Sequence, residues 1–245
     1  MHLIRKLEQF TKLSGEDKRA LERAASLSVR RLRAAEHIIS EGDQPRQVHL
    51  ILNGWACRYK VLEDGRRAIT AFLVPGDVCD MRVFILKQMD HSIAAISPLA
   101  VAQIPSDIVI EISDASPRLA RAFWWTSLVD EATAREWTAN LGQRDAFARV
   151  AHLFCELFVR LLGVGLVNGC SCELPVTQEQ LGEATGISTV HVNRTLQDLR
   201  EAGLIELKGK TLTIPDLEAL KAAAMFNDNY LHLDREGAAL DANEA

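Results

Sequence analysis

The sequence lacks the features that mark membrane, secreted and catalytic proteins. No window reaches the ~18 uninterrupted apolar residues of a membrane span, because prolines and polar residues break the most apolar stretch, residues 93–112. The first ten residues are charged and contain no apolar signal segment. Five cysteines form no recognisable disulfide framework, so we expect a reduced, cytoplasmic protein. No nucleophile–base pairing and no phosphate-binding glycine loop is recognisable, so we do not expect an enzyme.

The chain also lacks an excess of positive charge. It has 28 Lys and Arg against 33 Asp and Glu, a net charge of −5. From Gln143 onward there are 9 basic and 15 acidic residues, a balance of −6, which leaves +1 for the part before it. The overall charge therefore attracts neither nucleic acid nor an anionic membrane. If the C-terminal half binds DNA, it must do so through a local patch on an acidic body.

The first 115 residues are predicted to form a β domain. Short apolar runs at 37–40, 48–52, 68–74 and 100–104 are separated by the turn sequences EGD, NG, DG and PGD. Asn-Gly and Asp-Gly supply the positive φ that tight hairpins require. Many short strands at this spacing predict a barrel, roll or sandwich. A helix over 14–25 precedes them, capped by Ser14 with Asp17 three residues on.

Residues 116–142 are predicted to form one long helix. Ser116 and Pro117 suit its start. Apolar side chains occupy one stripe of this helix and also its neighbouring faces. A helix that buries a single surface needs only one apolar stripe, so this helix is expected to have two surfaces to cover. One interpretation is a helix wedged between two domains of a monomer. The interpretation we favour is pairing with its own copy in a homodimer, through Ala122, Trp125, Val129 and Ala132.

Residues 143–225 carry a helix-turn-helix pattern. Thr177 caps one helix, Ser188 caps the next, and Gly186 between them tolerates left-handed backbone. Two helices joined by so short a turn touch closely. That contact needs a small residue, Gly182, opposite an apolar one, Val192.

A basic hairpin and a tail follow. Residues 204–214 alternate apolar and polar around Lys208-Gly209-Lys210, which predicts the wing of a winged helix, with a further helix after Pro215. The final segment, 226–245, is predicted to be a C-terminal tail. From Asp234 it is acidic and rich in alanine, so we expect it to fray.

The second helix of the pair presents polar side chains that a DNA major groove accepts. Arg194 is the candidate for a bidentate contact to guanine, and the helix starts at Thr177 and Ser188 suit phosphates. The alternative is a winged helix that binds protein, with these residues merely solvated. The predicted DNA contacts are Thr177, Gln178, Ser188, Thr189, Val190, His191, Asn193, Arg194, Lys208 and Lys210.

The layout resembles the Crp/Fnr family of bacterial transcription regulators over nearly the whole chain. The sequence TQEQLGEATGISTVHVNRTLQDLREAGLI carries the most specific part of the likeness; EGD, ILNG, PGD and RDAFARVAHLF carry the rest. The resemblance implies an α+β protein with an N-terminal antiparallel, jelly-roll-like β-roll, a long dimerisation helix and a C-terminal winged helix-turn-helix. It implies a homodimer that binds palindromic double-stranded DNA and responds to a small effector or a redox or gas signal. RNA polymerase is a further expected partner.

Several positions depart from the family pattern. Val190 replaces a base-reading glutamate, which puts the half-site sequence in question. The positions matching the cyclic-nucleotide pocket are Gly76, Asp77, His91, Ser92, Ala134 and Arg135. Because the arginine that would neutralise a cyclic phosphate is missing, the pattern argues against cyclic AMP. The first cysteine is Cys57, which argues against an N-terminal iron–sulfur cluster, so the effector is unknown.

A rival hypothesis is a haem- or redox-responsive sensor that acts mainly through protein contacts. His91, Cys79 and Asp80 near the expected pocket could be ligands, although an isolated histidine is more often a plain surface residue. Cys170 and Cys172 could form a redox switch in a loop, or be inert. Gel-shift binding with steep salt dependence favours the regulator, and a Soret absorption band favours a haem sensor.

Overall fold

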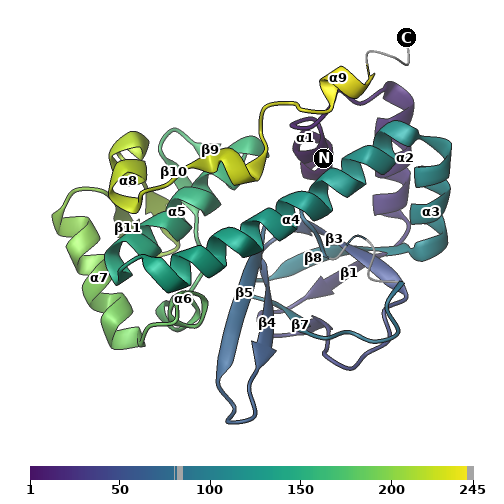
Figure 1. The fold of residues 1–245 in the computed structure, drawn as a ribbon. Coiled ribbons are helices and arrows are strands. Elements are labelled where there is room, and N and C mark those ends of the chain that lie inside the picture. The colour runs from purple at the N-terminus through teal and green to yellow at the C-terminus, as the bar shows by residue number, and fades with distance from the viewer. Residues whose placement is uncertain (80, 82–84, 242–245) are drawn as a thin grey trace. The chain divides into compact units, whose positions relative to one another are not determined.

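A computed structural model describes residues 1–79, 81 and 85–241 (Figure 1). The chain forms two compact units, which we describe separately. Unit 1 comprises Met1–Tyr59, Phe72–Ala132 and Leu231–Ala245, and unit 2 comprises Lys60–Ala71 and Thr133–Tyr230. The long helix is therefore shared between the units, and the tail from Leu231 returns to unit 1.

Unit 1 contains two four-stranded sheets whose described pairings are antiparallel, except that Lys60–Ala71, the end of β4 and most of β5, is assigned to unit 2. The first sheet has the order β1 (Val29–Leu32), β8 (Leu99–Pro105), β3 (Gln47–Asn53) and β6 (Val78–Cys79). The second has the order β2 (His37–Ile39), β7 (Ser92–Ala95), β4 (Ala56–Val61) and β5 (Arg67–Leu73). The predicted strands at 37–40, 48–52, 68–74 and 100–104 are confirmed within a residue or so at each end. β1, β4, β6 and β7 are additional.

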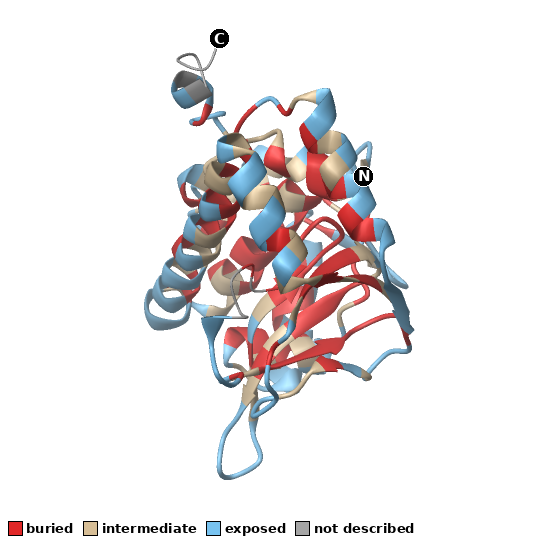
Figure 2. Ribbon diagram, turned by 90° about the vertical axis from the view of Figure 1, so that its right-hand side faces the viewer, coloured by how far each residue is buried: buried red, intermediate tan, exposed pale blue. Residues whose placement is uncertain are grey.

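Alternation along the strands gives the first sheet two buried faces. On β8, Leu99 and Val101 belong to the core between the sheets, whereas Ala102 and Ile104 belong to a core shared with helices. This two-residue period is the one that a pleated strand imposes. Figure 2 shows the buried residues concentrated on these strands. At the turn after β3, Gly54 has φ +81°, and a Cβ there would lie 2.2 Å from the Pro98 carbonyl oxygen, so only glycine fits.

The helices of unit 1 include α1 (His2–Leu7), α2 (Gly15–Ser26), α3 (Ser106–Ala115) and the first part of α4 (Pro117–Gln143). The predicted cap of α2 is confirmed, because Ser14 and Asp17 each accept the other's backbone N–H. Helix α3 was not predicted, because its residues were assigned to the strand region. At the start of α4, Ser116 Oγ accepts the Leu119 N–H at 3.2 Å.

Unit 2 is centred on α5 (Ala146–Gly163), which is buried along most of its length and packs on the other helices of the unit. Those helices are α6 (Gln178–Thr185), α7 (Thr189–Glu201) and α8 (Leu217–Ala224). A small sheet has the order β11 (Glu206–Lys208), β12 (Thr211–Thr213), β10 (Ser171–Glu173) and β9 (Val167–Asn168). A short 3-10 helix, η2 (Asp228–Leu231), follows α8, and α9 (Ala238–Asp241) lies in the tail.

Candidate DNA-binding surface and effector region

Helices α6 and α7 form the predicted helix-turn-helix. Thr177 and Gln180 make a reciprocal capping box, and Gly186 ends α6 with φ +68°. A Cβ on Gly182 would lie 2.7 Å from the Ile187 carbonyl oxygen and 3.7 Å from Val192, so the close crossing requires glycine. Ser188 Oγ then accepts the His191 N–H at the start of α7. Local capping chemistry and one small residue therefore fix the geometry of the pair.

The outer face of α7 is open to solvent. Val192, Leu196 and Leu199 are buried, while Val190 is 81% exposed. Asn193 Nδ2 donates to Gln178 Oε1 at 3.2 Å, which ties the reading face to the start of α6. Each of the ten predicted DNA contacts is exposed. Exposure of this many polar groups beside a buried apolar stripe is what a groove-reading helix needs.

The wing places two lysines at its tip. Gly209 turns the β11–β12 hairpin with φ +62°, and Lys208 and Lys210 flank it. Lys208 Nζ lies 2.9 Å from Glu206 Oε2, and this hydrogen bond raises the pKa of the lysine. Lys208 therefore stays charged, as a phosphate contact requires.

Two residues predicted for a nucleotide pocket, Gly76 and Asp77, have close neighbours within unit 1. Asp77 is buried, accepts the Val74 N–H and forms an ion pair with Lys6 Nζ at 2.6 Å. A Cβ on Gly76 would lie 3.0 Å from the backbone of His2. Residues of α1 thus occupy the space next to this turn.

The remaining predicted pocket residues divide between the two units. Ser92 Oγ accepts the Glu41 N–H at 2.9 Å, and His91 Nδ1 lies 2.7 Å from Asp90 Oδ1. Ala134 and Arg135 are exposed positions on α4 in unit 2. Asp80, a suggested ligand, lies outside the described residues. Ala134 and Arg135 thus belong to a different unit from Gly76, Asp77, His91 and Ser92, and the pocket assignment stays a prediction.

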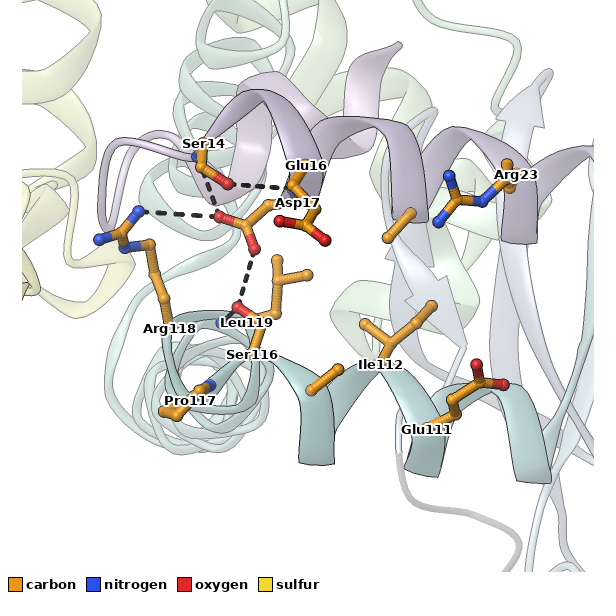
Figure 3. Close-up of a pocket in the computed structure, with 12 residues that line it drawn as sticks. Ser14, Glu16, Asp17, Arg23, Glu111, Ile112, Ser116, Pro117, Arg118 and Leu119 are labelled. Carbon is orange, nitrogen blue, oxygen red and sulfur yellow. Dashed lines mark hydrogen bonds and ion pairs between the residues drawn. The ribbon is translucent and has the colours of Figure 1, made fainter.

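A cavity of about 450 Å³ lies between α2, α3 and the start of α4 (Figure 3). Asp17 points toward the first turn of α4, accepts a hydrogen bond from Ser116 Oγ at 2.7 Å and lies 3.7 Å from Arg118. Burial opposes ionisation of Asp17, but the hydrogen bonds from Ser14 and Ser116 outweigh it and lower its pKa. A carboxylate at this helix start is the favourable arrangement for the helix dipole. Arg23 and Glu111 also line the cavity.

The apolar stripe predicted for dimerisation faces the protein's own interior. All four of its residues are buried, and the first three belong to the core of unit 1: Ala122, Trp125, Val129 and Ala132. The exposed apolar side chains of α4 include Trp124 and Leu128, at 56% and 58%. The prediction chose the wrong stripe because Trp124 and Trp125 are adjacent, and period alone does not say which of the two faces the core.

The cysteines and histidines do not gather into a centre. The five cysteines are free, and Cys170 is the exposed one. Burial raises the pKa of Cys172 to about 11, which makes it a poor thiolate beside Cys170. Among the residues that the structure describes, no group of three or more His, Cys, Asp or Glu could hold a metal. None of the described helices has the length and apolar character needed to cross a bilayer.

The wing and the closely packed helices α6 and α7 place the chain among winged helix-turn-helix DNA-binding proteins, here joined to an antiparallel β-roll. The family model of the Crp-like helix-turn-helix domain matches residues 148–223, and that of the cyclic nucleotide-binding domain matches residues 29–116. Together they cover about two thirds of the chain. The chain belongs to the Crp/Fnr family of transcription regulators.

Curated relatives and solved structures agree with this assignment. The nitrogen fixation regulation protein FixK of Bradyrhizobium diazoefficiens is 28% identical, over 78% of this chain and 80% of the relative. The anaerobic regulatory protein of Pasteurella multocida is 24% identical, over 77% of this chain and 69% of the relative. The structure of FixK2 from Bradyrhizobium japonicum has a TM-score of 0.72 at 24% identity, covering 80% of this chain and 96% of that one. At that identity the solved structure supports the fold alone.

Proposed function

We propose that the protein acts as a homodimer that reads a pseudo-palindromic DNA site with α7. Two copies of α7 would enter major grooves about 34 Å apart, one turn of DNA. The observation that carries the proposal is the solvent-exposed outer face of α7, set on a buried apolar stripe. Because this half of the chain is acidic overall, its contacts with DNA phosphates must come from this local surface and the wing lysines.

Three side chains are proposed to read bases. Arg194 can donate two hydrogen bonds to a guanine, and its side chain is exposed on α7. Val190 has no hydrogen-bonding group, so it favours contact with a thymine methyl. Asn193 is held by Gln178 through one amide hydrogen, which leaves its carbonyl oxygen to accept from a base. We expect the half-site to differ from that of relatives with a glutamate at the Val190 position.

The proposed dimer surface is the exposed side of α4 around Trp124 and Leu128. A cavity of about 280 Å³ in unit 1 adjoins Trp124 and is lined by apolar residues that include Val109 and Phe123. Exposed apolar side chains beside an apolar hollow favour association. A two-fold pairing of α4 with its copy would cover both.

We also propose that an effector other than cyclic AMP acts through unit 1. Supporting this, Asp77 is already paired with Lys6, and His91 stands in the sequence where cyclic-AMP binders carry an arginine. A thermal-shift screen of nucleotides, haem and small anions would test for a ligand. A rise in melting temperature with cyclic AMP would contradict this part of the proposal.

The DNA-binding proposal is tested by Arg194→Ala on a duplex obtained by selection from random DNA. We expect a loss of about 1–3 kcal/mol for the preferred site and relaxed specificity at one base pair. Arg200→Ala is the matched control, since it removes an exposed arginine from the far end of the same helix. Unchanged site preference in Arg194→Ala would show that α7 is not the reading helix.

A further inference from the structure

The C-terminal segment after α8 docks in both units. Within unit 2, Tyr230 is buried and donates a hydrogen bond to Glu156 Oε2 at 3.0 Å. Within unit 1, the Arg235 N–H donates to the Gln9 carbonyl at 3.0 Å, and the Gly237 N–H donates to the Phe10 carbonyl at 3.1 Å. The expectation that the chain frays from Asp234 is therefore wrong for these residues.

The anchor in unit 2 is a buried polar cluster. Glu156 lies on α5 with no exposed surface, and Trp137 Nε1 from α4 donates to the same carboxylate oxygen as Tyr230, at 2.9 Å. Arg160 donates to the other oxygen at 3.1 Å. The three donors come from α4, α5 and the C-terminal segment. A buried carboxylate is costly unless it is hydrogen-bonded, so the cluster holds these three elements together.

Aromatic packing and a helix end add to this anchor. The His152 ring stacks on Tyr230, with centroids 6.0 Å apart, and lies 4.9 Å from the Phe226 ring. Burial, with a smaller contribution from Arg144, lowers the pKa of His152 to about 3, so the ring is neutral. Arg144 also donates to the carbonyl oxygens of Ala224 and Met225 at the end of α8. The aromatic packing on His152 and the Arg144 hydrogen bonds to the end of α8 thus both hold the start of the segment on unit 2.

The anchor in unit 1 depends on close contact with one aromatic ring. A Cβ on Gly237 would lie 2.6 Å from two atoms of the Phe10 ring. The Phe10 ring also stacks on Trp125 of α4, with ring centroids 5.7 Å apart. The end of the segment therefore lies on the ring that packs against the long helix within unit 1.

We propose that residues 226–237 form a strap that restrains unit 2 relative to unit 1, and that undocking at Gly237 releases the restraint. The link between anchors is short: five residues from Tyr230 to Arg235 reach at most about 18 Å when fully extended. Any reorientation that moves Glu156 and Gln9 further apart than this reach allows must break one anchor. In the regulator, strap release would be one step of the conformational switch.

The test uses the full-length protein with Gly237→Leu, whose side chain cannot fit against Phe10, and a second variant that ends at Asp234. Ala238→Ser, at an exposed position, is the control. Hydrogen exchange of the Arg235 and Gly237 amides reports docking. We expect wild-type protection, about tenfold faster exchange in Gly237→Leu, and wild-type behaviour in the control.

Small-angle X-ray scattering then reports the restraint, with all variants compared at the same oligomeric state. Both release variants should show a larger radius of gyration and a broader distance distribution than wild type and Ala238→Ser. Two results would overturn the proposal: unprotected amides in the wild type, or released variants whose scattering superposes on that of the wild type. Because neither measurement uses DNA, failure of the DNA-binding proposal would not be confused with failure of the strap.

Discussion

Replacing Tyr230 with phenylalanine probes the buried cluster that joins α4, α5 and the C-terminal segment. Tyr230→Phe removes one hydroxyl and leaves the ring against His152. The lost hydrogen bond is one of two, each about 3 Å long, that converge on Glu156 Oε2. Hydrogen bonds to charged partners contribute about 1.5–3 kcal/mol each. We therefore expect the free energy of unfolding to fall by about this amount at pH values above the folded-state pKa of Glu156, where the carboxyl is ionised.

The loss of unfolding free energy in Tyr230→Phe should increase as the pH rises. Burial raises the pKa of Glu156 above 4.5, while Arg160, Trp137 and Tyr230 lower it in part. A raised folded-state pKa gives a stabilising contribution that is complete below about 4.5 and is lost as pH rises through the folded-state value. Removing the tyrosine donor raises the folded-state pKa further. The difference between variant and wild type should therefore be smallest near pH 4.5 and grow as the pH rises.

Urea unfolding followed by circular dichroism between pH 4.5 and pH 9 measures this difference. Tyr59→Phe is the matched control, because its hydroxyl contacts an imidazole nitrogen, His37 Nε2, at 2.9 Å and not a buried carboxylate. It should cost about 1 kcal/mol. A Tyr230→Phe loss that shrinks with rising pH, or that equals the control at every pH, would refute the reasoning.

Three further predictions concern the dimer, the helix crossing and the wing. Leu128→Glu should raise the dimer dissociation constant, measured by sedimentation, at least about tenfold, because like charges would face each other across the two-fold axis. Leu162→Glu, at a similarly exposed position on α5, should leave the constant unchanged. Gly182→Ala should cost about 1–3 kcal/mol of stability through its clash with the turn; Gly142→Ala, with open space around it, should gain about 0.5–1 kcal/mol. Lys208→Ala should weaken binding to all DNA sequences alike and lower the salt slope by about 1. A stable Gly182→Ala protein, or a Lys208→Ala effect on one sequence only, would contradict these assignments.

The helix-turn-helix could be derived from the sequence because its determinants are local. Caps at Thr177 and Ser188, the turn at Gly186 and the small residue Gly182 lie within a dozen residues of one another. Such short-range chemistry fixes backbone geometry before distant contacts matter. The hairpin turns of the β-roll followed from the same kind of signal. Helix α3 was missed because an apolar run of its length does not distinguish strand from helix.

Long-range packing decided the rest. Which of two adjacent tryptophans on α4 faces the core depends on Phe10, more than a hundred residues away, and period leaves both options open. Arg160 lies four residues from Glu156 on α5, but Trp137 and Tyr230 come from distant segments, so sequence spacing does not mark the whole cluster. The tail was expected to fray because its composition is acidic and rich in alanine, yet two of its backbone N–H groups donate to carbonyl oxygens near the N-terminus. The sequence alone thus determined the class of DNA-binding element, while the tertiary structure decided which surfaces remain exposed, because burial depends on contacts between distant segments.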